Sequence, residues 1–164
     1  MLIGISSCLL GNRVRYDGGH RLAAHVKDTL DPYVTWVPVC PEVDCGLGVP
    51  RPTMQLTGRP ENPRLVTIEA GLDHTERLLK WSEKKAAELE AAGIAGFVFK
   101  CRSPSCAFMD AEVFAASGTA LKGPGLFART VMHRLPNLPF GDEEGLADPA
   151  AMDVFLDSTG ARPG

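Results

Sequence analysis

The sequence has no long run of uncharged apolar residues and no large excess of charge of either sign. A membrane-spanning helix needs about 20 consecutive apolar residues, and the apolar stretches here are far shorter. Lys plus Arg total 17 and Asp plus Glu total 20, which gives a formal net charge of −3. A protein that wraps bare nucleic acid usually has a strongly basic face. The composition therefore argues against a membrane-spanning protein and against a protein that wraps bare nucleic acid. A few placed arginines can still hold a small anion.

Internal repeats and low-complexity tracts are absent as well. Hydrophobic residues make up 45% of the chain and charged residues 23%, which is typical of globular proteins and argues against disorder. The 164 residues suit one domain, and a chain of this length folds without needing a metal or a disulfide. Residues 1–5 lack a positively charged region and predict a first strand rather than a signal peptide. We expect a cytoplasmic protein.

Short apolar runs alternate with helical patterns along the chain, which is typical of parallel βαβ units with helices on both faces of a sheet. We therefore expect a single-domain, three-layer, Rossmann-like α/β fold with a mostly parallel sheet, spanning residues 1–140. A C-terminal tail with a possible short helix follows over residues 141–164. Strands are predicted at 2–5, 34–39 and 96–99, with a short extra strand at 64–68, helices at 21–30, 72–92, 124–135 and 148–156, and mostly loop at 40–63.

Five cysteines stand out in a chain without a secretion signal, where thiols serve metal, cluster or thiol chemistry more often than disulfides. Cys8 follows the first predicted strand, Cys40 follows the second, and Cys106 lies just beyond the third. Parallel strands end at the same edge of a sheet, where ligands bind, and neighbours lie about 4.8 Å apart. The three thiolates can therefore converge on one small object, such as a cubane iron–sulfur cluster.

The spacing leaves other interpretations open. Cys40-x4-Cys45 and Cys101-x4-Cys106 form two pairs that could make a structural zinc site, although no compact Cys/His knuckle surrounds them. One cysteine could instead be a nucleophile with one of the four histidines as its base. The simplest alternative is a set of unrelated buried thiols, since free cysteine is among the most buried residue types.

Polar residues accompany each of the three cysteines. Residues 15–20 contain two glycines that allow a tight turn with N–H groups suited to an anion, and an ordinary turn is the alternative. Glu42 lies two residues beyond Cys40 and could pass protons, although a solvated loop acid is the simpler interpretation. Residues 102–105 place a guanidinium and two hydroxyls beside Cys106. Arginines of this kind can bind phosphate in a bidentate manner.

Five motifs occur in a fixed order, at residues 7–11, 15–19, 38–42, 50–52 and 102–106. In these motifs the chain resembles the thiouracil desulfidase (TudS-like) family, formerly a domain of unknown function. The resemblance runs from about Leu2 to Leu135. It implies a cytoplasmic α/β protein with an oxygen-sensitive [4Fe-4S] cluster at the C-terminal edge of the strands, held by three cysteines and with one iron free to take sulfur from a thiolated pyrimidine.

The family's functional residues carry over by motif position. The cluster ligands implied are Cys8, Cys40 and Cys106, the catalytic acid or base is Glu42, and the catalytic serine that contacts substrate is Ser103. The residues expected to bind the substrate are Ser7, Arg15, Asp17, Gly18, Gly19, Arg51, Arg102 and Ser105.

The resemblance implies an enzyme that cleaves a C–S bond in 2- or 4-thiouracil, 4-thiouridine or its monophosphate. The products are the oxo-pyrimidine and sulfide, and the reaction is hydrolase-like and needs no net electron transfer. The alternatives are an enzyme that removes sulfur from 4-thiouridine in tRNA, and a non-catalytic zinc or iron–sulfur module.

The chain departs from the family pattern in a few places. Cys45 and Cys101 stand where many relatives have small residues, and Ala107 replaces a usual glycine. Either thiol could supply a fourth cluster ligand and close the open iron. Residues 135–157 look like the linker before the second domain of longer members. A free base or nucleotide is therefore favoured over tRNA.

Overall fold

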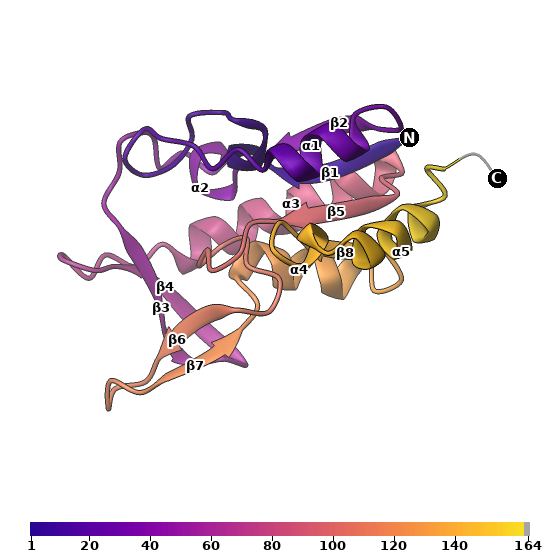
Figure 1. Ribbon diagram of the computed structural model, residues 1–164. Helices are drawn as coiled ribbons and strands as arrows, with labels where there is room; N and C mark the ends of the chain where they lie inside the picture. The colour runs from indigo at the N-terminus through magenta and orange to yellow at the C-terminus, as the bar shows by residue number, and fades with distance from the viewer. Residues whose placement is uncertain (163–164) are drawn as a thin grey trace.

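The computed structural model describes residues 1–162, which fold around two separate β-sheets (Figure 1). The main sheet has the strand order β2-β1-β5-β8, and all of its neighbours pair in parallel. Every residue of β5 is buried, as expected for a central parallel strand covered on both faces. The strands are β1 (Leu2–Ser6), β2 (Thr35–Val39), β5 (Gly96–Phe99) and β8 (Phe140–Asp142).

Helices cover both faces of the main sheet, which confirms the predicted three-layer α/β arrangement. On one face, α1 (Ala24–Leu30) and α5 (Pro149–Thr159) pack with Ile3, Ile5 and Val98. On the other face, α3 (Thr75–Ala92) and α4 (Leu126–Arg134) enclose a core centred on phenylalanine rings. Its members include Phe97, Phe99 and Phe127, with Phe97 and Phe99 stacked at 4.4 Å between ring centroids.

The second sheet extends away from the main sheet as a separate arm (Figure 1). Its order is β4-β3-β6-β7: two antiparallel hairpins joined by a parallel pairing of β3 with β6. One face packs on α3 and α4 through Leu78 and Leu126. The strands are β3 (Met54–Arg59), β4 (Asn62–Thr67), β6 (Ala111–Phe114) and β7 (Ala120–Gly123).

The predicted loop at 40–63 is wrong in two places, because it contains the short helix α2 (Pro41–Asp44) and the strand β3. Strands β6 and β7 were also not expected from the sequence. The three residues Ala120, Leu121 and Lys122 of β7 are exposed, so no alternation of buried and exposed positions marks that strand. No helix among residues 1–162 is both long and apolar enough to cross a membrane.

Helix ends agree with the expected capping residues more closely than helix starts do. Gly93 caps α3 in the left-handed conformation, as predicted, and the Asp148 side chain accepts the Ala150 N–H at the start of α5. Helices α1, α3 and α4 begin two or three residues later than the pattern suggested. Before α1, the Ala23 N–H donates instead to the carbonyl of Leu9, which holds this segment against the turn after β1.

The chain after residue 140 contributes to the same core. Strand β8 pairs with β5, and η2 (Gly145–Ala147) and α5 supply Leu146, Met152, Phe155 and Leu156 to the cluster under β1. The helix expected in this tail is α5. The division of the chain at residue 140 stays a prediction.

A Gly4→Ala substitution tests the packing of the two central strands. Gly4 pairs with Phe97 across β1 and β5, and a Cβ atom at Gly4 would lie 2.2 Å from Cδ2 of that ring. We expect a loss of at least about 1–3 kcal/mol in the free energy of unfolding, as for other overpacked cores, measured by urea denaturation. In a protein that already carries Phe97→Leu, adding Gly4→Ala should lower the free energy of unfolding by less than it does in the parent, because the smaller side chain leaves room for the new Cβ atom. A Gly4→Ala protein within about 0.5 kcal/mol of the parent would contradict this packing.

Candidate active site

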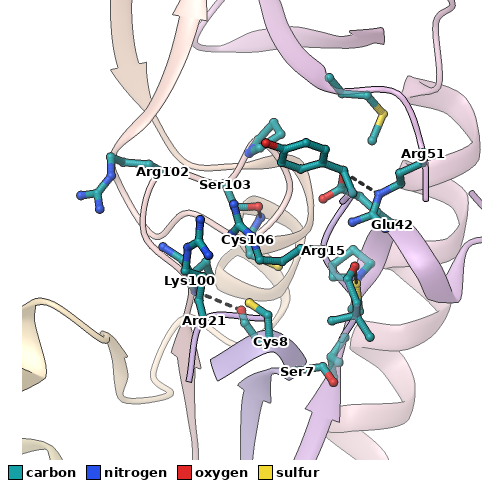
Figure 2. Close-up of a pocket in the computed structure, with 18 of the residues that line it drawn as sticks. Ser7, Cys8, Arg15, Arg21, Glu42, Arg51, Lys100, Arg102, Ser103 and Cys106 are labelled. Carbon is teal, nitrogen blue, oxygen red and sulfur yellow. Dashed lines mark hydrogen bonds and ion pairs between the residues drawn. The ribbon is translucent and has the colours of Figure 1, made fainter. Parts of the chain in front are cut away.

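Three parallel strands end at a cavity of about 390 Å³, shown in Figure 2. Cys8 lies in the single turn η1 (Ser7–Leu10) directly after β1, and Cys40 follows β2 as the N-cap of α2. Cys106 lies in the loop after β5. All three line the cavity, so the structure brings together the cysteines that the strand pattern predicted to meet.

Cys8 and Cys106 are buried, and Cys40 is partly buried. Burial raises the pKa of Cys40 to about 11 and raises the pKa of Cys106 further, with the neighbouring thiols Cys40 and Cys8 adding to the effect. Burial also raises the pKa of Cys8, although the charges of Lys100 and Arg15 oppose this. The thiols therefore stay protonated unless positive charge enters the cavity, and a bound metal centre supplies such charge.

The spacing of these thiols does not suit one metal ion. The sulfurs of a zinc site lie roughly 3.8 Å apart, because each Zn–S bond is about 2.3 Å long and the geometry is tetrahedral. Within residues 1–162, the only group of three metal-ligating side chains with atoms within 4.8 Å of one another is Cys101, Asp142 and Glu143. Cys8, Cys40 and Cys106 face the same cavity, but their three sulfurs do not all lie within 4.8 Å of one another, which suits a larger object that the three thiols surround.

Glu42 is held at the cavity by two neighbouring side chains. It lies in the first turn of α2, and its side chain is only 15% exposed. The Ser105 hydroxyl donates to Oε2 at 3.0 Å, and Arg51 Nε pairs with Oε1 at 3.5 Å, the pair marked in Figure 2. Since Ser105 is adjacent to Cys106, the hydroxyl links the carboxylate to the cysteine loop.

Ser103 also faces the cavity and organises the loop that carries Cys106. Its Oγ accepts the N–H of Cys106 at 3.0 Å and the N–H of Ser105 at 3.3 Å, a local turn that serine often forms. Its hydroxyl lies 3.2 Å from that of Ser105. Because the Ser105 proton goes to Glu42, the Ser103 proton is available for Ser105 or for a molecule in the cavity.

The predicted arginines line the cavity in different ways. Arg51 is committed to Glu42 and to the carbonyl of Gly48 at 3.0 Å. Arg102 lies across the cavity from Glu42 in Figure 2, is 60% exposed and pairs with Glu144 at 2.6 Å. Arg15 lies over the Tyr16 ring at 5.8 Å, and its buried Nε has no hydrogen-bond partner among residues 1–162. Arg15 is thus the predicted arginine most available to an anion.

Ser7 lines the cavity, whereas Asp17, Gly18, Gly19 and Ser105 are not part of its wall. Asp17 accepts the Gly19 N–H at 2.9 Å, and Gly18 has a φ of 80° in the turn closed by its N–H to the Arg15 carbonyl. These residues shape the loop that carries Arg15. Their part in substrate binding stays a prediction.

Sequence reasoning missed several cavity residues, among them the cations Arg21 and Lys100. Lys100 directly follows β5, and the strand-end rule that singled out the cysteines would also have found it. Of the two unusual cysteines, Cys101 lines the cavity, whereas Cys45 does not and packs against the core of the second sheet.

The α/β fold with three cysteines at one cavity defines a class of protein, and comparisons with known proteins identify that class. A family model described as 2-thiouracil desulfurase matches residues 3–143, so the chain belongs to this family, and the predicted resemblance is confirmed. A solved structure described as the [4Fe-4S]-dependent thiouracil desulfidase TudS is similar, with a TM-score of 0.69, 29% identity, and coverage of 93% of this chain and 97% of that one. The uncharacterized protein YbbK of Bacillus subtilis (strain 168) is 28% identical over 134 residues, which are 77% of this chain and 87% of YbbK.

A Gly125→Ala substitution tests what holds the Cys106 loop in position. Gly125 is the N-cap of α4, and a Cβ atom there would lie 2.6 Å from the carbonyl carbon of Ser105 and 2.9 Å from the N of Cys106. Backbone atoms cannot rotate away, so we expect a loss of about 1–3 kcal/mol in the free energy of unfolding and a lower iron content after anaerobic purification.

Gly123→Ala is the matched control, because its Cβ would meet only Pro60 Cβ at 3.4 Å. We expect its free energy of unfolding to change by less than about 0.5 kcal/mol and its iron content to stay at the parent level. Equal behaviour of the two variants would show that the close approach at Gly125 does not fix the cysteine loop.

Proposed function

We propose that this protein is a [4Fe-4S]-dependent desulfidase that removes sulfur from a thiolated pyrimidine. The observation that carries the proposal is the meeting of Cys8, Cys40 and Cys106 in one cavity with a positioned carboxylate, Glu42. Membership of the 2-thiouracil desulfurase family and similarity to a [4Fe-4S]-dependent thiouracil desulfidase support it. The five free cysteines suit a reducing compartment, and we propose a cytoplasmic location.

The donor set at the cavity fits an iron–sulfur cluster. Soft thiolates are the usual ligands of such clusters, and Cys8, Cys40 and Cys106 would hold it. Lys100 and Arg15 favour the ionised form of Cys8, as cluster binding requires. When bound through three thiolates, a cluster supplies one iron with an open position, which can act as a Lewis acid toward a thiocarbonyl sulfur. Cys101 is grouped with Asp142 and Glu143, and we propose that it is not a ligand.

Glu42 is the group placed to handle the proton of the attacking water. Its carboxylate is fixed by Ser105 and Arg51, so one face stays directed at the cavity. We propose that Glu42 takes a proton from water as the oxygen bonds to the thiocarbonyl carbon. The C–S bond then breaks, sulfur leaves with the electron pair as hydrosulfide, and the second water proton moves to the sulfur. The balance is C=S plus H2O giving C=O plus HS⁻ plus H⁺, without net electron transfer.

The cavity size and its arginines support a small substrate. About 390 Å³ lies in the range of small-molecule sites, which suits 2- or 4-thiouracil, 4-thiouridine or its monophosphate. We propose that Ser103 donates its free proton to the base and that Arg15 binds an anionic group. The same cavity dimensions favour a free base or nucleotide over thiolated tRNA.

Anaerobic purification followed by iron, sulfide and zinc analysis tests the cofactor. We expect about four irons and four sulfides for each chain, as a [4Fe-4S] cluster contains. Cys8→Ser, Cys40→Ser and Cys106→Ser should each lose most of the iron, because serine is a poor substitute for a soft thiolate ligand. The matched variants Cys45→Ser and Cys101→Ser should keep it. Stoichiometric zinc without iron, or loss of iron in a matched variant, would overturn the assignment.

A Glu42→Gln substitution tests the proton transfer. The parent should convert 4-thiouridine monophosphate or 2-thiouracil to the oxo-pyrimidine, followed by the loss of thiocarbonyl absorbance and by released sulfide. Glutamine keeps the size of the side chain but cannot take the proton, so we expect kcat to fall by about 10²–10⁴-fold with the iron content unchanged. Glu69→Gln, on an exposed turn, is the control and should keep parental kcat. Parental activity in Glu42→Gln would exclude this role.

A further inference from the structure

We propose that the Lys100 ammonium stabilises the negative charge on the departing sulfur and that Glu143 is the residue that positions it. This inference rests on the proposed function, and it assigns a task to a buried ion pair at the cavity wall. Lys100 pairs with Glu143 at 2.6 Å between Nζ and Oε1. Neither residue belongs to the five sequence motifs.

Lys100 lies in the cavity wall at the end of an interior strand of the main sheet. It directly follows β5, the strand that lies between β1 and β8, and it lines the same cavity as Cys8 and Cys106. Figure 2 shows Lys100 on the Cys8 side of the cavity. It is only 9% exposed. Because water screens a charge weakly at such a site, the ammonium acts on a nearby anion more strongly than an exposed lysine does.

The hydrogen bonds of the pair hold the Lys100 ammonium in place and leave one of its N–H donors for another group. Lys100 Nζ donates to Glu143 Oε1 and, at 2.9 Å, to the carbonyl of Cys101. An ammonium has three N–H donors, so one remains. Glu143 Oε2 accepts the N–H of Cys101 at 2.8 Å. Both carboxylate oxygens are therefore occupied, and the side chain is held to the backbone that leads from β5 to Ser103.

The reaction creates the charge that this donor suits. In the balanced step above, sulfur leaves the carbon with the electron pair of the C–S bond, and negative charge grows on sulfur as the bond breaks. A fixed donor in a desolvated site stabilises growing charge at little reorganisation cost. Lys100 thereby acts on the leaving sulfur, at the opposite end of the reacting bond from the attacking water that Glu42 serves.

The other cations of the cavity suit this task less well. Arg51 is paired with Glu42 itself, and Arg102 is largely exposed and paired with Glu144. Arg21 contacts the carbonyl of His20 through an exposed hydrogen bond. Arg15 has a buried Nε without a hydrogen-bond partner in the described part of the chain and suits an anionic part of the substrate. The Arg51 side chain is as buried as that of Lys100, but its partner Glu42 is the carboxylate that serves the attacking water, whereas Glu143, the partner of Lys100, is not part of the cavity wall.

A Lys100→Gln substitution tests the proposal in the cluster-loaded protein. We expect kcat to fall about hundredfold, the scale of losing one transition-state donor, with KM within about threefold because ground-state binding is little changed. The kcat of Lys100→Arg should be at least about tenfold higher than that of Lys100→Gln, since arginine keeps the positive charge. A titration with sodium hydrosulfide, followed by the cluster absorbance, should give a dissociation constant at least about tenfold weaker for Lys100→Gln.

Two further variants separate this role from a structural one. Glu143→Gln should weaken hydrosulfide binding and lower kcat in the same direction, because Lys100 loses its anchor. Lys85→Gln removes the ion pair with Glu88 on α3, far from the cavity wall, and should leave kcat and hydrosulfide binding unchanged.

Two results for Lys100→Gln would overturn the role of Lys100. One is kcat within about threefold of the parent, and the other is a loss of kcat that vanishes when the rate is expressed per bound iron. If the parent protein itself releases no sulfide from thiopyrimidines, the proposed function fails instead, so the two failures are distinguishable.

Discussion

The site depends on the parallel pairing of β1 with β2 on one side and with β5 on the other. This pairing sends three loops out at one edge of the sheet, and each loop carries a cysteine. Two features protect the pairing: a glycine in β1 that leaves room for the Phe97 ring, and a second phenylalanine stacked behind it. The meeting of the thiols at one cavity is therefore a consequence of strand packing.

Two electrostatic effects act in the cavity: burial disfavours charge on the thiols, and nearby carboxylates pair with most of the cations. Burial disfavours ionised thiols, so the cations around them matter more than their number suggests. Most of these cations are neutralised by carboxylates of α2 or of the segment after β8. The C-terminal part of the chain thus contributes to the charge balance of a cavity whose cysteines all lie before residue 107.

Sequence reasoning found what depends on local pattern. The β-branched and apolar runs predicted β1, β2 and β5, and the strand-end rule placed Cys8, Cys40 and Cys106 together. Of the second sheet it found only β4, as the short strand predicted at 64–68; it missed the other strands because, for example, β7 is exposed and β3 lies in a region rich in proline and glycine. Long-range contacts were equally invisible: the pairing of Lys100 with Glu143 joins residues 43 positions apart, and no spacing rule connects them.

Because the three cysteines lie far apart along the chain, their meeting at one cavity depends on the folding of the main sheet. Two of the four main-sheet strands, β2 and β5, lie between Cys8 and Cys106 in the sequence, and closing such a long loop around an inorganic centre is costly in an unfolded chain. The three thiols therefore line one cavity only once β1, β2 and β5 have paired. Binding of the proposed cluster is thus coupled to the folding of the main sheet, because the sheet brings its ligands together.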